Sequence, residues 1–234
     1  MVRYCFERLE KKYLLNENQL SLVLEGIKEN MKPDEYGKYT IYNIYYDTDD
    51  WQLIRDSVEK PVYKEKLRVR SYGPPAPGSN VYIELKKKFG GIVYKRRISV
   101  PESELPDFLS GGNGGDSQIA HEIDRFRSFY GAKPKVFIAY ERLAFAGIED
   151  SDVRLTLDSN IRFRTDHLSL DMGYGDEIIP RGTTLMEIKL PGVCPIWLCR
   201  LLSKARAYPI SFSKYGKCYT EHILTEAKEP VLSC

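Results

Sequence analysis

Long basic side chains recur at every second position in three consecutive segments between residues 61 and 100. The cations of residues 64–70 stand at even positions, and residues 81–88 and 92–100 alternate polar and apolar side chains in the same way. Successive side chains of a strand point to opposite faces, so the pattern predicts three neighbouring strands with one strongly basic face. Gly90 and Gly91 are typical of a hairpin turn. This much like charge on one face is costly unless an anion or carboxylates lie among the cations.

The composition is that of an ordinary soluble globular protein. The chain has 234 residues, of which 42% are hydrophobic and 29% are charged. We expect one domain over residues 1–228, followed by a C-terminal tail at 229–234 that is disordered. The net charge is only +2, which argues against a diffuse DNA-binding surface, so any anion site must be local.

Other sequence features bear on the compartment. No apolar run is long enough to span a bilayer, and the N-terminal residues carry no signal-peptide core. The five cysteines lack zinc-ligand spacing and, with three histidines, indicate reduced thiols. We therefore expect a cytoplasmic protein without a membrane span of its own, although a membrane protein could be its partner.

The remaining segments predict more strands, together with helices that each have one apolar stripe. Strands are expected at residues 3–14, 39–46, 135–145, 153–158, 161–164 and 184–190, and helices after Asn16, at 117–130, at 195–205 and, after a lead-in at 209–216, towards residue 226. Residues 166–180 are expected to form a hairpin or a loop, and the glycines at 111–115 a linker. The fold class is therefore α+β, with about eight mostly antiparallel strands and helices on the apolar face of the sheet.

Two arrangements of such a sheet are open. The polar face can be exposed to solvent, which is the usual explanation for a half-polar strand, or the sheet can close so that the polar faces line a wet tunnel. In the closed form the charged residues converge. Many cations together imply a polyanionic ligand, and a few carboxylates among them imply a divalent metal, hence phosphate chains with Mg2+ or Mn2+.

Several short motifs, in their order and spacing, resemble one known family. They are Glu10-Lys11-Lys12-Tyr13, residues 44–48, Lys66-Leu67-Arg68-Val69-Arg70, residues 83–86, residues 94–97, Tyr140-Glu141-Arg142, residues 154–158, Glu187-Ile188-Lys189 and Ser213-Lys214. From about Phe6 to Ile223 the chain resembles the catalytic VTC (vacuolar transporter chaperone) domain of the CYTH-like triphosphate tunnel metalloenzymes. The resemblance implies an eight-stranded antiparallel β-barrel flanked by helices. It also implies a polyphosphate polymerase that transfers the γ-phosphate of ATP to a growing chain and releases ADP.

The resemblance also implies roles for individual residues. Catalytic phosphate contacts are implied for Lys12, Arg68, Arg70, Lys86, Lys95, Arg97, Arg142 and Lys189, substrate binding for Tyr140, Arg154, Ser213 and Lys214, and binding of Mn2+ or Mg2+ for Glu187, Glu10 and Glu84. Ser211 departs from the family, which often has a lysine there; this would weaken chain binding unless Arg206 or Lys217 replaces the cation. The implied ligands are ATP and inorganic polyphosphate.

Several other charged residues have alternative interpretations. The acidic residues 47–50 could bind a metal, but capping of the following helix is the favoured interpretation. Asp158 could bind a metal or form a structural ion pair. Lys64 and Lys66 share the parity of Arg68 but are expected near a tunnel mouth, and Arg96 falls on the apolar face and is expected to be a surface cation.

The sequence leaves three functions open. They are the polymerase, a hydrolase of inorganic or nucleoside triphosphates that uses the same tunnel, and a non-catalytic polyphosphate-binding module. The Glu-x-Glu-x-Lys start that is typical of the hydrolases is only partly met, because the first strand has Arg8 before Glu10 and Lys12. Nucleic acid is not expected as a ligand, because aromatic residues do not alternate with the basic ones on the polar faces.

Overall fold

The computed structural model describes residues 9–110 and 117–226. The predicted glycine linker, the tail at 229–234 and the first residues of the predicted N-terminal strand lie outside these ranges. The chain divides into two compact units, each built from segments that are distant in sequence. Among the described residues, unit 1 contains 9–40, 140–161 and 179–212, and unit 2 contains 41–110, 117–139, 162–178 and 213–226.

The strands confirm the predicted α+β class. They are β1 (Leu9–Leu15), β2 (Met31–Asp47), β3 (Tyr63–Tyr72), β4 (Asn80–Phe89), β5 (Ile92–Pro101), β6 (Lys133–Gly147), β7 (Arg154–Arg164), β8 (Asp176–Glu177) and β9 (Thr184–Leu190). The helices are α1 (Glu17–Ile27), α2 (Gln52–Val58), α3 (Leu105–Leu109), α4 (Gln118–Tyr130), α5 (Ile196–Lys204), α6 (Lys214–Cys218) and α7 (Leu224–Glu226), with short 3-10 and π segments at Glu102–Glu104 and Tyr219–Ile223.

The sheet differs from the predicted barrel in one respect. Its hydrogen-bonded order is β1-β9-β7-β6-β2-β3-β4-β5, and β8 pairs with β7. Within residues 9–110 and 117–226, β1 and β5 are the two ends of this order and do not pair, so the sheet is open rather than closed. Alternation of side chains predicts the face of a residue, but it does not predict the last pairing that closes a barrel.

Element boundaries also differ from expectation in two places. The strand expected at residues 39–46 is the end of a longer strand, β2, which begins at Met31. The pieces expected at 153–158 and 161–164 form a single strand, β7. Residues 166–180 are mostly irregular, as expected, and contain only the two-residue strand β8.

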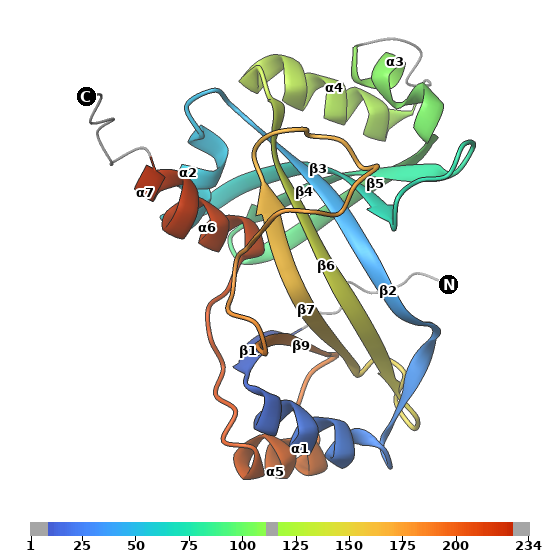
Figure 1. Cartoon of the computed structure of the whole chain (residues 1–234), viewed down its shortest axis with the longest axis vertical. Coiled ribbons are helices and arrows are strands. Elements are labelled where there is room, and N and C mark those ends of the chain that lie inside the picture. The colour runs from blue at the N-terminus through green and yellow to red at the C-terminus, as the bar shows by residue number, and fades with distance from the viewer. Residues whose placement is uncertain (1–8, 111–116, 227–234) are drawn as a thin grey trace. The chain divides into compact units, whose positions relative to one another are not determined.

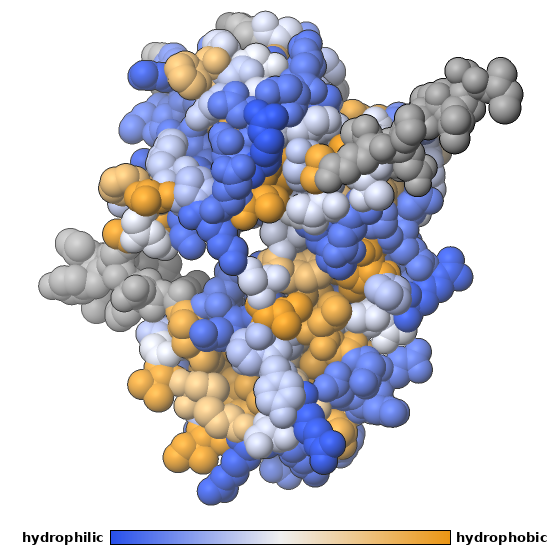
Figure 2. All heavy atoms as spheres, turned by 90° about the vertical axis from the view of Figure 1, so that its left-hand side faces the viewer, coloured by the Kyte–Doolittle hydropathy of each residue, from blue (hydrophilic) through white to orange (hydrophobic). Residues whose placement is uncertain are grey.

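Unit 1 packs helices α1 and α5 on its strands (Figure 1). The side chain of Asn16 accepts a hydrogen bond from the Gln19 backbone and so caps α1, as the sequence predicts. The core is formed by residues of α1, α5, β7 and β9, including Val23, Leu155 and Leu198. Apolar side chains also lie at the surface of the half that carries α1 and α5 (Figure 2), where Val193 and Ile196 are exposed.

Unit 2 packs α3 and α4 on one face of β3, β4 and β5 (Figure 1). The central odd-numbered residues of β3 and β4, such as Leu67 and Ile83, are fully buried on that side. Gly90 and Gly91 both have positive φ and connect β4 to β5 as the predicted hairpin turn. Because helices cover one face of these strands, the even-numbered residues of β3 and β4 and the odd-numbered residues of β5 occupy the other face.

Two further expectations concern the cysteines and membrane-spanning helices. Cys194, Cys199 and Cys218 are free thiols, and the other two cysteines lie outside the described ranges. In the part of the chain that the structure describes, no helix is both long and apolar enough to cross a membrane.

Candidate functional site

Even-numbered side chains of β3 and β4 and odd-numbered side chains of β5 form one cationic surface, and we call its three central rows the basic face. Its members lie in cross-strand rows: Lys66, Lys86 and Lys95 in one row, Arg68, Glu84 and Arg97 in the next, and Arg70 beside Tyr82 in the third. The six cations on this face surround one carboxylate, that of Glu84. The predicted phosphate ligands Arg68, Arg70, Lys86, Lys95 and Arg97 are therefore all brought together in unit 2.

Glu84 is the centre of the basic face. Its side chain is 2% exposed, and its Oε2 lies 2.7 Å from Arg68 Nη2 and 3.8 Å from Arg70 Nε. Its Oε1 lies 2.7 Å from Lys95 Nζ and 3.3 Å from Arg97 Nε. One carboxylate thus holds four cations in place. It cannot neutralise them, so the basic face keeps a large positive charge.

The titration of these groups reflects that excess. Burial would raise the pKa of the Glu84 carboxyl, but Arg68, Arg70 and Lys95 outweigh it and lower the pKa to about 2. Burial lowers the pKa of Lys95, and the charges of Arg70 and Arg68 add to this effect against the attraction of Glu84. A phosphate oxygen that entered this face would relieve the repulsion between the cations.

Two residues of β2 that the sequence reasoning missed support the arginines. Arg68 Nη1 donates to Tyr45 Oη at 3.0 Å, and Arg70 Nε donates to Asn43 Oδ1 at 2.9 Å. Asn43 in turn donates from Nδ2 to the Ile138 carbonyl at 3.0 Å, which fixes its amide. Asn43 and Tyr45 stand at alternate positions of the strand predicted at residues 39–46, so their shared face is the signal in the sequence.

Ser213 and Lys214 stand at the start of α6 in unit 2. The Ser213 hydroxyl accepts from the Gly216 backbone and caps α6, and Lys66 Nζ lies 3.4 Å from the same hydroxyl. Tyr215, the next residue of α6, donates to the buried Asp47 carboxylate at 2.7 Å. Lys66 and this segment therefore adjoin each other.

A second charged group of residues, the mixed-charge cluster, lies on β1, β9, β7 and β6 of unit 1. In the strand register Lys12 faces Glu187, and Lys189 faces both Glu10 and Arg154. Lys12 Nζ lies 3.3 Å from Glu10 Oε1 and 3.8 Å from Glu187 Oε2, and it donates to the Phe212 carbonyl at 3.0 Å. Lys189 Nζ lies 2.6 Å from Glu187 Oε1.

Arg142 extends the mixed-charge cluster on β6. It forms a bidentate pair with the fully buried Asp158 through Nε–Oδ1 at 2.6 Å and Nη2–Oδ2 at 2.8 Å. Its guanidinium carbon also lies 5.2 Å from the ring centre of Tyr140. Burial would lower the pKa of Arg142, but the charges of Tyr140, Asp158 and Glu187 outweigh it and raise the pKa. Asp158 is thus engaged in an ion pair, the structural alternative left open by the sequence.

The metal-binding capacity of the mixed-charge cluster is limited. Across residues 9–110 and 117–226, no three acidic, histidine or cysteine side chains gather closely enough to hold a metal ion by themselves. Glu10 and Glu187 do approach the same lysine, and Thr156 lies opposite Glu187 in the register. The buried Thr156 Oγ1 has no hydrogen-bond partner in the described part of the chain. Carboxylate and hydroxyl oxygens suit Mg2+ or Mn2+, which bind one or two carboxylates together with phosphates and water.

The other charged residues considered in the sequence analysis have structural roles or surface ion pairs. Asp47 caps α2 by accepting from the backbones of Leu53 and Ile54, which supports the capping interpretation of residues 47–50. Arg96 lies 3.5 Å from Glu122 of α4, on the helix-covered face. Lys217 pairs with Glu221 within its own helical turn.

Comparisons with known proteins find similar sequences and a similar fold. The model of the VTC domain family matches residues 7–222. The vacuolar transporter chaperone complex subunit 4 of Schizosaccharomyces pombe is 29% identical over 164 residues, which are 60% of this chain and 22% of that protein. A solved structure from Bacillus halodurans, provisionally named an adenylate cyclase, covers 88% of this chain and 93% of its own at a TM-score of 0.55 and 16% identity. That likeness shows a shared fold.

Proposed function

The chain belongs to the VTC domain family, and on this premise we propose that it is a metal-dependent polyphosphate polymerase. The proposed reaction transfers the γ-phosphate of ATP to the end of an inorganic polyphosphate chain and releases ADP. The S. pombe relative is named as a subunit of a vacuolar transporter chaperone complex, but the match spans only 22% of its length. The reaction and the substrates are therefore our proposal for this chain.

The basic face is the observation that carries the proposal. Lys66, Arg68, Arg70, Lys86, Lys95 and Arg97 share one face around a single buried carboxylate. Arginine offers planar, paired donors to phosphate oxygens, and lysine acts as a compact point charge. A row of phosphates can contact successive rows of this face, because rows repeat about every 7 Å along the strands.

The chemistry needs positioning and charge neutralisation rather than a protein nucleophile. A terminal phosphate oxygen of the acceptor chain attacks the γ-phosphorus, the bond to the β,γ-bridging oxygen breaks, and the electron pair leaves with ADP. The attacking oxygen is already ionised, so no general base is required. Arg68, Arg70, Lys95 and Arg97 would neutralise the charge on the phosphate oxygens during transfer.

The mixed-charge cluster contains the residues that would hold the divalent metal. Glu187 and Glu10 would bind Mg2+ or Mn2+, with Thr156 as a further oxygen donor. When bound, the ion supplies charge neutralisation of phosphate oxygens. Glu84 was also predicted as a metal ligand, but its four cationic neighbours repel a divalent ion, so we propose that Glu84 orients the arginines instead.

Incubation of the purified protein with ATP and Mn2+ tests the proposal. We expect ADP release and polymers that stain for polyphosphate on a gel. Release of inorganic phosphate without a polymer would identify a hydrolase. Binding of polyphosphate without turnover would identify the non-catalytic module. The Glu122→Gln variant serves as the control, because Glu122 contacts Lys87 and Arg96 on the helix-covered face.

A further inference from the structure

A pocket of about 420 Å3 opens where β3 ends and β4 begins, in unit 2. It is lined by Ser71, Tyr72, Pro74, Pro75, Ala76, Ser79, Asn80 and Tyr82. Its volume lies within the range of roughly 300–1,000 Å3 that is usual for small-molecule sites. The phosphate chemistry proposed above uses none of these residues directly, so the pocket needs a separate explanation.

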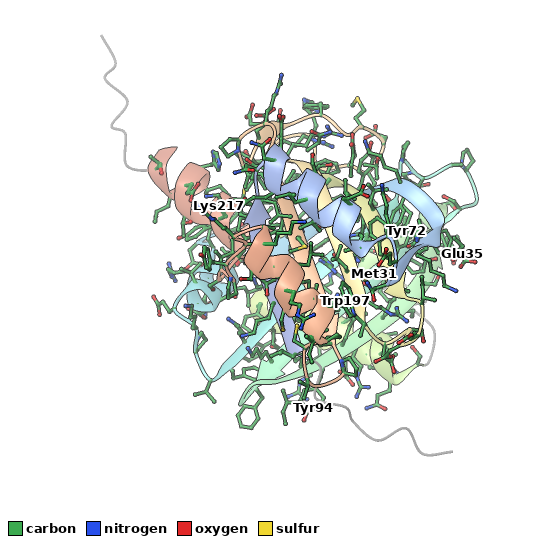
Figure 3. The ribbon with its side chains drawn as sticks, turned by 90° about the horizontal axis from the view of Figure 1, so that it is seen from below. Met31, Glu35, Tyr72, Tyr94, Trp197 and Lys217 are labelled. Carbon is green, nitrogen blue, oxygen red and sulfur yellow. The ribbon has the colours of Figure 1, made fainter. Side chains whose placement is uncertain are left out.

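The pocket adjoins the basic face through a shared arginine. Arg97 Nη2 donates to Tyr72 Oη at 3.0 Å, and its guanidinium carbon lies 3.9 Å from the ring centre of Tyr82. Burial would raise the pKa of the Tyr72 phenol, but the hydrogen bond and charge of Arg97 outweigh it and lower the pKa. Tyr72, which is labelled in Figure 3, follows Arg68 and Arg70 at the same parity of β3. The basic face therefore runs directly into the pocket.

The loop that forms the pocket wall has a defined conformation. Gly73 and Gly78 have positive φ, which other residues adopt at a cost, and two prolines follow Gly73. The Ser79 backbone donates to the Ala76 carbonyl at 2.9 Å, and the Ser79 carbonyl accepts from Glu102 at 2.9 Å. These hydrogen bonds hold the loop in place while the pocket beside it stays open.

One polar group in the pocket lacks a hydrogen-bond partner. The Ser79 Oγ atom is buried and finds no donor or acceptor within the described residues. Buried hydroxyl groups are nearly always hydrogen-bonded, so a ligand or a water that reached the Ser79 hydroxyl would complete it. The rings of Tyr72 and Tyr82, with centres 5.6 Å apart, offer aromatic surface in the same pocket.

We propose that this pocket binds the nucleoside part of a nucleoside triphosphate whose phosphates lie on the basic face. Tyrosine rings stack on bases of any sequence, and a hydroxyl can bond to a base or ribose edge. A nucleoside beside Tyr72 places its phosphates towards Arg97 and Arg70, about 7 Å further along β3, and towards Arg68 at about 13 Å. This inference rests on the proposed function only in taking the phosphate donor to be a nucleotide.

The test compares ATP with inorganic triphosphate by calorimetry, because the two ligands differ in the nucleoside alone. Triphosphate carries at least as much negative charge, so a basic face without a nucleoside pocket would bind it at least as tightly as ATP. We expect the wild type to bind ATP at least tenfold more tightly. Equal affinities, or tighter binding of triphosphate, would overturn the proposal.

Two variants test whether the difference in affinity between ATP and triphosphate arises in the pocket. Ala76→Trp fills the pocket and should weaken ATP binding at least tenfold, while triphosphate affinity stays within twofold, which also shows that the variant is folded. Ser79→Ala keeps the shape of the pocket and should weaken ATP binding a few-fold without affecting triphosphate. If ATP and triphosphate weaken equally in both variants, the pocket is only a structural support of the basic face.

Adenosine alone separates this inference from the proposed function. If neither phosphate ligand binds, the proposed function fails. Saturation-transfer NMR with adenosine then tests whether the pocket binds a nucleoside. A signal with the wild type that is lost in Ala76→Trp supports the proposal, and the absence of a signal overturns it.

Discussion

The two charged regions of this protein differ in how far their charges are compensated. The basic face of unit 2 has six cations around one carboxylate, Glu84. The mixed-charge cluster of unit 1 sets Lys12, Arg142, Arg154 and Lys189 against the carboxylates of Glu10, Asp158 and Glu187. The basic face is therefore suited to bind anions, whereas the cluster is nearly neutral and can accept a cation. Period-two patterns that look alike in sequence thus produce surfaces with different chemistry.

The largest effect should come from removing the carboxylate that we assign to the metal. Glu187→Gln keeps the size of the side chain but removes its charge, so we expect loss of polyphosphate synthesis by a thousandfold or more, about 4 kcal/mol in activation free energy. ADP release and polymer formation are the measurements, and circular dichroism checks the fold. Retained synthesis would remove Glu187 from the metal role.

A large effect on stability should follow from breaking the buried pair of the mixed-charge cluster. Asp158→Ala leaves the Arg142 guanidinium, whose side chain is only 15% exposed, without its bidentate partner. Loss of one partner of a buried pair costs about 3–5 kcal/mol in unfolding free energy, which urea denaturation measures. Lys38→Ala breaks a pair in which the lysine side chain is 59% exposed, and it should cost less than about 1 kcal/mol. Similar losses in the two variants would contradict this distinction.

The basic face should show its own pH dependence. Folding lowers the pKa of the Glu84 carboxyl from its usual 4.5 to about 2. Its contribution, on the order of 3 kcal/mol, is fully present above pH 4.5 and is lost as the pH falls through about 2. Acid unfolding of the wild type should contain this step, and that of Glu84→Gln should lack it. Identical acid profiles would show that the four cations do not depend on the Glu84 charge.

The smallest effect concerns a single phosphate contact. Arg68→Ala should weaken ATP binding by about 1–3 kcal/mol, the scale of one hydrogen bond to a charged group. Arg96→Ala is the matched control, because Arg96 pairs with Glu122 on the helix-covered face and should not change ATP affinity. Calorimetry measures both. Unchanged binding in Arg68→Ala would show that Arg68 does not contact the nucleotide.

Much of the basic face could be predicted from alternation alone. The even positions of β3 and β4, the hairpin at Gly90 and Gly91, and the placement of Arg96 on the opposite face follow from the local geometry of extended chains. The supporting roles of Asn43 and Tyr45 could not be predicted in the same way. They depend on the register between β2 and β3, which pairs Asn43 with Arg70 and Tyr45 with Arg68. Register is set by packing and turns rather than by one strand.

The sequence by itself determined which side chains share a face, where α1 and α4 begin, and that one face of β3–β5 is basic, because covalent geometry and capping act over a few residues. Only the tertiary structure decided that four cations converge on Glu84, that Arg142 pairs with Asp158, that the sheet stays open and that a pocket adjoins Arg97. Each of these depends on residues brought together from different strands. The free energy of bringing these residues together includes desolvation of charged groups and loop closure, and neither can be derived from a single segment.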